Sequence, residues 1–311
     1  MSNQILGLHH ITAISNNAQR NYDFYTRVLG LRLVKKTVNF DDPGTYHFYY
    51  GNEEGTPGTI LTFFPWEGIG QGYPGTGLAT EISYSVSPGS LEFWEERLKK
   101  FEVPVKEKIE RFGATHLPFA DPDGLALTLV VPTQTDPRKG WETIDIHSED
   151  ATKGFCQVTL TLRRMEKTAK VLTDIFGYRL LSQEANRYRF ITDAISTANI
   201  IDLLEEPDGE SGLNWAGTNH HIAFRVKNES TQMAFRERIL ENGLLPTHKI
   251  DRDYFYSVYF REPGGVLFEI ATDNPGFTVD ESLAELGTNL KLPDEFEPDR
   301  KMIEEALSKL K

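Results

Sequence analysis

The sequence of 311 residues contains a single cysteine, Cys156. One thiol cannot form an intrachain disulfide, so disulfide-stapled folds are excluded and a reducing compartment is favoured. Cys156 lies in a strand-like run, which predicts a small residue of the core. The first six residues lack the basic start and the long apolar stretch of a signal peptide, and no membrane-spanning run follows. These features predict a cytoplasmic protein.

Basic charge is also scarce, because 33 lysines and arginines face 46 acidic residues, which gives a net charge of −13. Such an excess of negative charge argues against non-specific binding of nucleic acids or anionic membranes. We therefore expect neither a nucleic acid nor a membrane as a partner. The length is sufficient for two domains.

An imperfect internal repeat organises the chain. Residues 23–34 resemble residues 170–181, and in both segments an amphipathic helix ends at a glycine, Gly30 or Gly177, before a strand. A second pair of similar segments begins at residues 82 and 222, with helices expected at about 89–101 and 230–242. In that pair Asp121-Pro122-Asp123-Gly124 and Glu262-Pro263-Gly264-Gly265 are tight-turn signals before a final strand.

These repeats predict four β-α-β-β-β modules, at roughly 5–65, 79–132, 152–205 and 218–272. The corresponding domain division is a first module pair at 1–132, a polar linker at 133–151, a second module pair at 152–272 and a C-terminal tail at 273–311. The Gly-rich stretch 66–78 is expected to be a loop. The tail is expected to hold a loop and then a charged helix near 298–311 with a solvated face.

Two histidine pairs occupy equivalent places in the repeat, and a carboxylate follows them on the last apolar strand. The pairs are His9-His10 and His220-His221, and the carboxylate is Glu269. Two imidazoles and one carboxylate form the facial triad that binds ferrous iron and leaves coordination positions open. Two such pairs in similar segments are much stronger evidence than one pair would be.

The two-residue period of a strand restricts which of these side chains can share a face. If His10 faces a barrel interior, Thr12 does too, while Ile11 packs outside; the same frame places His221 inward. Glu269 then lies among apolar neighbours, and an ionised carboxylate is costly to bury unless it is paired or binds a metal. The alternative is that Glu269 is a solvated strand residue and that the histidines are structural.

The repeat supplies an internal control for this metal site. The alignment of the modules places Gln157 opposite His10, Glu81 opposite His221 and Thr128 opposite Glu269. This second set lacks both histidines and the distal carboxylate. We therefore expect one metal site, built by modules one and four in the same barrel, and a structural barrel built by modules two and three. A site shared between subunits would satisfy the ligand positions equally well.

Several motifs resemble the hydroquinone-cleaving ring dioxygenases of the vicinal oxygen chelate superfamily. They are Leu8-His9-His10-Ile11-Thr12, Tyr46-His47-Phe48-Tyr49-Tyr50, His220-His221-Ile222-Ala223-Phe224 and the segment from Phe255 to Gly265. The resemblance covers nearly the whole chain and is greatest to a bacterial branch linked to quinone and hydroquinone resistance. It implies an α+β fold in which four βαβββ modules form two open, mixed β-barrels.

The resemblance also implies roles for individual residues. It assigns His10, His221 and Glu269 as metal ligands. It assigns catalytic positions near the metal to His220, Tyr259, Arg252, His9 and Thr12. His220 would act as an acid and base, Tyr259 would hydrogen-bond a substrate oxygen, and His9 would orient its neighbour. For Arg252 the residues leave open a local ion pair with Asp251 or Asp253 instead. The implied cofactor is Fe(2+), although Mn(2+), Zn(2+) or Ni(2+) suit the same donors.

The implied reaction is the cleavage of a hydroquinone ring by O2, in detoxification, with both oxygen atoms kept in the product. A catechol extradiol dioxygenase uses the same triad and remains an alternative. A glyoxalase-like isomerase or a thiol-dependent resistance protein is a second alternative, although such proteins usually need a fourth protein ligand. A metal-free protein that sequesters aromatics is a third. Paired barrels of this kind often form homo-oligomers, but the sequence reveals no interface.

Overall fold

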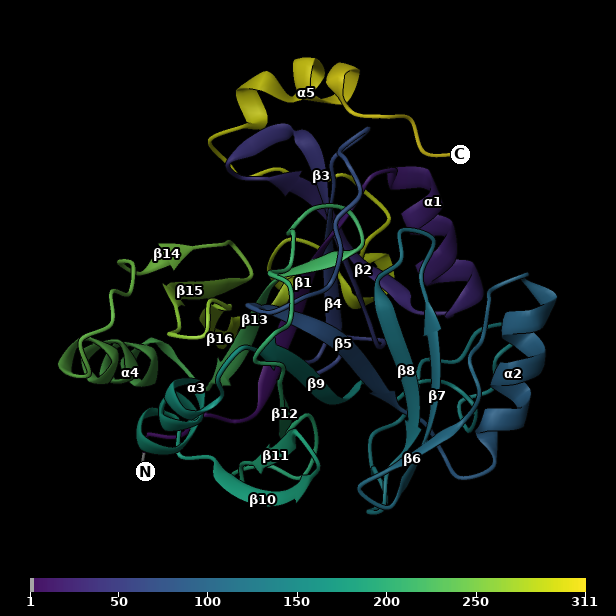
Figure 1. Ribbon diagram of the computed structural model, residues 1–311. Helices are drawn as coiled ribbons and strands as arrows, with labels where there is room; N and C mark the ends of the chain where they lie inside the picture. The colour runs from purple at the N-terminus through teal and green to yellow at the C-terminus, as the bar shows by residue number, and fades with distance from the viewer. Residues whose placement is uncertain (1–2) are drawn as a thin grey trace.

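The computed structural model describes residues 3–311, which form two curled eight-stranded sheets with few helices (Figure 1). The strand order is β14-β15-β16-β13-β1-β4-β3-β2 in the first sheet and β10-β11-β12-β9-β5-β8-β7-β6 in the second. In each sheet the two central strands pair antiparallel, and each of them pairs parallel with its other neighbour. This mixed topology of half-barrels confirms the predicted α+β fold.

The first sheet combines strands from both ends of the chain. Its strands are β1 (Leu8–Ser15), β2 (Arg32–Asn39), β3 (Asp42–Gly51), β4 (Ile60–Pro65), β13 (Thr218–Val226), β14 (Ile250–Asp251), β15 (Phe255–Arg261) and β16 (Leu267–Pro275). These are the strands of the predicted modules one and four. The predicted pairing of these two modules in one barrel is confirmed.

The second sheet is built from the middle of the chain, from modules two and three. Its strands are β5 (Leu78–Ser85), β6 (Ile109–Arg111), β7 (Ala114–Ala120), β8 (Ala126–Val131), β9 (Phe155–Leu162), β10 (Arg179–Glu184), β11 (Arg187–Ile191) and β12 (Ile200–Glu205). Residues 132–154, all of which the structure describes, contain no helix or strand. The division of the chain into domains at 133–151 stays a prediction.

One helical segment follows the first strand of every module. These segments are α1 (Ala18–Asp23), α2 (Ser90–Lys100), α3 (Glu166–Lys170) and α4 (Glu229–Glu241). In the first and third, a π-helical turn continues the helix, Phe24–Val28 or Val171–Ile175, and ends before Gly30 or Gly177. Both glycines have positive φ, which supports the predicted helix ends. Within residues 3–311 no helix is long and apolar enough to cross a membrane.

The core lies between the sheets and the helices that cover their outer faces. Ile11, Ile222 and Phe268 are fully buried in it, and Phe268 stacks on Phe176 with ring centroids 6.2 Å apart. Because strand neighbours alternate between faces, burying these three side chains outside the first sheet turns the neighbouring His10, His221 and Glu269 inward. The predicted inward and outward frame is therefore confirmed.

The C-terminal tail differs from its prediction. The terminal helix, α5, is shorter than expected, spanning only Arg300–Ala306, and it lies over β2 and β3 (Figure 1). It is also not simply solvated, because Ile303 and Leu307 are buried against Val38 and Leu292. The many charged residues of this segment led to the prediction of a solvated helix, and the few apolar residues between them were overlooked.

Cys156 also differs from its prediction as a core residue, because it is only half-buried. It sits at a β-bulge in β9, where the register with β5 moves from Gln157–Ser83 to Phe155–Tyr84. A bulge leaves one residue unpaired and turns its side chain away from the regular alternation. Burial of the thiol itself raises its pKa to about 12, so little thiolate forms near neutral pH.

Candidate metal centre

The predicted ligands lie on three adjacent strands in the middle of the first sheet. His10 on β1 pairs across the antiparallel ladder with Ala223 of β13, and Ala223 pairs with Glu269 of the parallel strand β16. His221 lies two residues before Ala223 and therefore on the same face. The strand pairing thus brings His10 together with two side chains that lie more than two hundred residues further along the sequence.

The three ligand atoms converge on one point. His10 Nε2 and His221 Nε2 are 3.4 Å apart, and they lie 3.2 and 2.9 Å from Glu269 Oε2. Two neighbouring ligands that each sit about 2.1 Å from a metal ion lie about 3.0 Å apart when they are at right angles. The three separations match this requirement.

Burial makes the cluster informative about a metal. Glu269 is fully buried, His10 and His221 are nearly so, and the two imidazole Nε2 atoms are the groups that face Oε2 of Glu269. A buried carboxylate is costly unless its charge is compensated, and a cation held by the three side chains would compensate it. The donor set therefore fits a divalent metal with open coordination positions.

The electrostatics of the cluster favour a deprotonated Glu269 and a neutral His221. Burial alone would raise the pKa of Glu269, but the adjacent His10 and His221 outweigh it and hold the pKa well below its usual range. Burial lowers the pKa of His221, and Glu269 offsets only part of that shift. A metal needs ligands in these deprotonated forms.

A second layer of hydrogen bonds fixes the ligands. The Nδ1 atoms of His9 and His10 are 2.9 Å apart, and those of His220 and His221 are 2.8 Å apart. Because Nδ1 of each ligand is engaged, its Nε2 is left for the metal. Ser257 on β15 donates a short hydrogen bond to Oε1 of Glu269.

Two β-bulges explain how adjacent histidines reach each other. The register between β1 and β13 skips His9 on one strand and His220 on the other. At each bulge the strict alternation of faces is broken, so the bulged histidine can turn its ring toward its neighbour. The sequence argument assumed regular alternation and could not foresee these two contacts.

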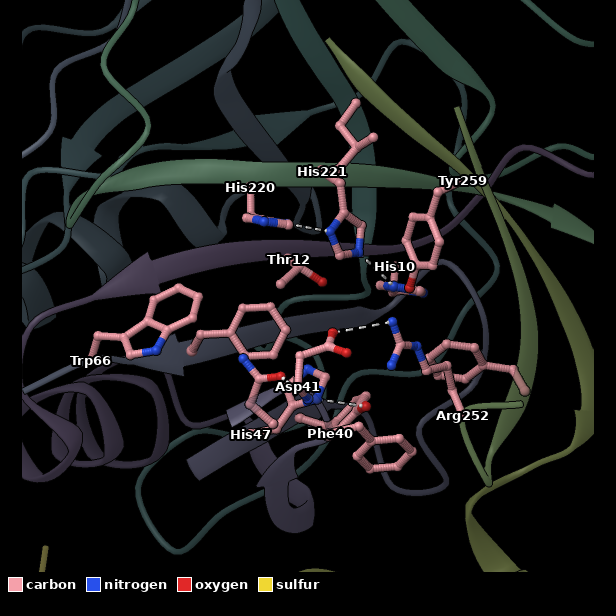
Figure 2. A pocket seen from close by; sticks show the side chains of 15 residues that line it. His10, Thr12, Phe40, Asp41, His47, Trp66, His220, His221, Arg252 and Tyr259 are labelled. Carbon is pink, nitrogen blue, oxygen red and sulfur yellow. Dashed lines mark hydrogen bonds and ion pairs between the residues drawn. The ribbon is translucent and has the colours of Figure 1, made fainter. Parts of the chain in front are cut away.

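A cavity of about 350 Å³ opens in front of the ligands (Figure 2). Among its lining residues are Thr12, His220, Arg252 and Tyr259, as the sequence predicts, together with Phe64, Trp66, Phe255 and Leu267. The wall combines aromatic side chains with several polar ones, and a cavity of this size has room for a small molecule such as a single ring. The aromatic side chains of Phe48, Tyr50 and Phe224, in contrast, belong to the core.

His9 is the predicted site residue that does not line this cavity. Its ring packs against Phe255 with centroids 5.1 Å apart and faces a separate cavity near Gly55 and Phe277. Burial lowers the pKa of His9 well below its usual value, and the charge of His10 adds to the effect. His9 thus lies beside its neighbour His10 and outside the cavity, and its orienting role stays a prediction.

Arg252 does not form the local ion pair that the sequence left open with Asp251 or Asp253. Its Nη2 lies 3.7 Å from Oδ2 of Asp41, in the turn between β2 and β3, and its guanidinium lies 5.6 Å from the ring centroid of Tyr259 (Figure 2). The contact joins the two outer edges of the first sheet across the mouth of the cavity.

Sequence reasoning missed several residues of the cavity. Asn39, Asp41, His47 and Tyr49 line it, and Ser257 supports Glu269 from behind. The spacing of His47 and Tyr49 on one strand places both on the same face, which was a usable signal. The positions of Asn39, Asp41 and Ser257 depend on the pairing of strands that are distant in the sequence, and no sequence pattern indicated them.

Comparisons with known proteins agree with this geometry. The model of the Glyoxalase/Bleomycin resistance protein/Dioxygenase superfamily matches residues 7–129 and 154–270. The chain belongs to this superfamily. In Bacillus subtilis, MhqO and MhqE, each named as a putative ring-cleaving dioxygenase, are 47% and 46% identical to it, over 99% and 98% of this chain and 97% and 99% of theirs.

Two further comparisons refine this membership. The chlorohydroquinone/hydroquinone 1,2-dioxygenase of Sphingobium indicum is 36% identical, over 94% of this chain and 93% of that protein. A crystal structure of a putative dioxygenase from Bacillus subtilis is 45% identical, with a TM-score of 0.93, covering 100% of this chain and 99% of that one. These relatives confirm the prediction of a dioxygenase enzyme.

Other residue types occupy the corresponding positions of the second barrel. Its strand registers equate Gln157 with His10 and Thr128 with Glu269, which confirms the alignment of the repeat. Gln157 accepts a hydrogen bond from Arg189, and Glu81 forms an ion pair with Arg111 at 2.8 Å. In residues 3–311, the cluster of His10, His221 and Glu269 is the one group with metal-ligand geometry.

Proposed function

We propose that this chain is an Fe(II)-dependent dioxygenase that opens the ring of hydroquinone-type aromatics. The observation that supports this most is the convergence of His10, His221 and Glu269 on one point beneath a cavity for a single ring. The named activity of the Sphingobium indicum relative supports the same substrate class. We further propose a role in detoxification and a cytoplasmic location.

The metal, when bound, would be held by His10, His221 and Glu269 and would supply open positions at which substrate and O2 meet. Imidazole and carboxylate donors suit Fe(II) as well as Mn(II), Zn(II) or Ni(II), and the family resemblance favours iron.

The residues around the cavity would handle the proton of the substrate hydroxyl. Burial lowers the pKa of His220 to about 3, and the neighbouring His221 adds to the shift, so the ring is neutral near neutral pH and has one unprotonated nitrogen. His220 is half-buried at the cavity wall, where a substrate hydroxyl can reach it. We propose that His220 is the general base.

Tyr259 and Arg252 would stabilise the negative charge that this deprotonation creates. Burial raises the pKa of Tyr259, and the charge of Glu269 raises it further, so the phenol keeps its proton and can donate a hydrogen bond. Arg252 brings a positive charge to the same wall. Donors that are already in place before the reaction stabilise developing charge most effectively.

Three protein ligands, rather than four, favour this class over a glyoxalase-like isomerase. The described residues contain no fourth histidine, cysteine, aspartate or glutamate in the cluster. The fold is also shared with glyoxalase I of Zea mays, at a TM-score of 0.63, but at 15% identity this likeness, which covers 86% of this chain and 92% of that one, concerns the fold alone.

Oxygen consumption with a panel of substrates tests the proposal. The protein is loaded with Fe(II) without air, and O2 uptake is then followed with 2-methylhydroquinone, hydroquinone and catechol in parallel. Uptake with a hydroquinone, together with the loss of ring absorbance, is the expected result. Uptake with catechol alone would assign the protein to the extradiol enzymes, and no uptake by iron-loaded protein would contradict the proposal.

A further inference from the structure

A chain of hydrogen bonds runs across three strands in the wall of the cavity. Tyr49 Oη lies 2.9 Å from His47 Nδ1, and His47 Nε2 lies 2.9 Å from Thr62 Oγ1. Thr62 Oγ1 in turn lies 2.8 Å from Thr12 Oγ1. Tyr49, Thr62 and Thr12 pair in register across β3, β4 and β1, so the chain follows one row of the sheet.

The protons of this chain can be arranged in two directions. In the first, Tyr49 donates to His47 Nδ1, His47 donates from Nε2 to Thr62, and Thr62 donates to Thr12. In the second, Thr12 donates to Thr62, Thr62 donates to His47 Nε2, and His47 donates from Nδ1 to Tyr49. Each direction requires a neutral His47 with a single ring proton, but on opposite nitrogens.

The two directions differ in which hydroxyl is left with a free proton. In the second direction Tyr49 accepts from His47, and the described residues offer no other acceptor for the proton of Tyr49. In the first direction the free proton belongs to Thr12. Both hydroxyls border the cavity, but a phenol is a stronger donor and a weaker acceptor than an aliphatic hydroxyl, so a bond donated by Tyr49 to the imidazole nitrogen favours the first direction.

The protonation states agree with the first direction. Burial raises the pKa of Tyr49, so its phenol keeps the proton that it must donate. Burial lowers the pKa of His47 well below its usual value, and the charges of His10 and Arg252 add to this, so the ring is neutral. His47 therefore has one N–H, and a bond accepted at Nδ1 places that N–H at Nε2.

We propose that the chain Tyr49–His47–Thr62 fixes the Thr12 hydroxyl as a hydrogen-bond donor into the cavity, with His47 as the positioning residue. A lone threonine hydroxyl rotates freely and can point away from a ligand, whereas this one already accepts from Thr62 and must direct its own proton elsewhere. Thr12 would then donate to the oxygen on which the bound substrate carries negative charge. That final step rests on the proposed function, but the direction of the chain does not.

Nitrogen NMR of the metal-free protein tests the direction without any activity. Two-bond correlations of ¹⁵N-labelled histidine distinguish Nε2–H from Nδ1–H rings, and a His47→Asn variant identifies the signal of His47. We expect the Nε2–H form in the wild type and a mixture of both forms in Tyr49→Phe. An Nδ1–H ring in the wild type would overturn the inference.

Turnover of the iron-loaded enzyme tests the consequence for Thr12. Tyr49→Phe and Thr62→Val should each lower kcat about tenfold, with little change in KM and in bound metal, because the donor remains but is no longer held. Thr62→Ser should restore most of kcat. The matched control is Tyr50→Phe, which removes a buried hydroxyl that bonds Asn21 in the core, away from this chain.

The outcomes separate this inference from the proposed function. If Tyr49→Phe behaves no differently from Tyr50→Phe, the positioning role of His47 is wrong even when the wild type is active. If the wild type shows the Nε2–H ring but turns over no hydroquinone, the hydrogen-bond direction is supported and the proposed function fails instead.

Discussion

At the scale of the residue, Glu269 combines a negative charge with complete burial. Its Oε1 accepts from Ser257, and its Oε2 faces the Nε2 atoms of His10 and His221. The two flanking imidazoles hold the pKa of the carboxyl low although burial opposes them. A cation bound by the three side chains would compensate this buried charge.

Glu269→Gln should weaken metal binding while the fold remains intact. Neutral glutamine removes the charge but keeps the size, so the loss of affinity should exceed the roughly 10–100-fold that outer-layer substitutions cost. Titration of the metal-free protein with Fe(II) or Zn(II), with circular dichroism as a check on folding, measures this. Glu81→Gln in the second barrel is the matched control and should bind as the wild type does. Equal affinities in both variants would refute the ligand assignment.

Residue types and spacing pointed to the histidine pairs and Glu269 as candidate ligands, whereas the four predicted residues that line the cavity beside them were implied only by the family resemblance. The paired histidines and Glu269 are polar residues within otherwise apolar strand segments, and the two-residue period of a strand assigns the three ligands to a common face. The partner of Arg252 was beyond the sequence, because Asp41 is distant along the chain and only the curvature of the sheet brings it near. The contacts of His9 and His220 depend on bulges, which leave no clear sequence signal.

At the scale of the element, the C-terminal tail is fastened to the first barrel by a buried ion cluster. Lys35 on β2 is fully buried and lies 2.6 Å from Asp280 and 2.5 Å from Glu281. Its ammonium also lies 4.8 Å from the ring centroid of Tyr254. The sequence predicted a helix in the tail, but nothing in the pattern of lysines identified the one that is buried.

Lys35→Ala should lower the free energy of unfolding by about 3–5 kcal/mol, because Glu281 would stay buried without its partner. Urea denaturation followed by fluorescence gives the midpoint and slope. Lys36→Ala is the control, since that side chain bonds only the carbonyl oxygen of Thr288 at the surface and should cost about 0.5 kcal/mol or less. A similar small change in both variants would show that the ion cluster contributes little to stability.

At the scale of the whole molecule, neither half of the chain can complete a sheet alone. Each sheet takes four strands from residues before 132 and four from residues after 154. The candidate metal site is divided in the same way, with His10 in the first half and His221 and Glu269 in the second. The sequence repeat predicted that modules one and four share a barrel, because the candidate ligands occur only in these two modules.

A cut within residues 133–151 should therefore leave a stable complex, whereas separate halves should not fold. A protease site inserted near Ile144, which is fully exposed, gives uncut and cut forms of one protein. We expect the cut form to run as a single species in size-exclusion chromatography and to bind one metal ion. Halves expressed alone should bind none with comparable affinity, and a half that folds and binds metal by itself would contradict the account.

The most direct test of the central claim is to follow the oxygen atoms. Fe(II)-loaded enzyme is supplied with 2-methylhydroquinone under ¹⁸O2, and the product is analysed at once by mass spectrometry. The account predicts a ring-opened product that carries both atoms of one labelled oxygen molecule. A quinone without labelled oxygen, or a product with a single labelled atom that does not arise by later exchange with water, would contradict it.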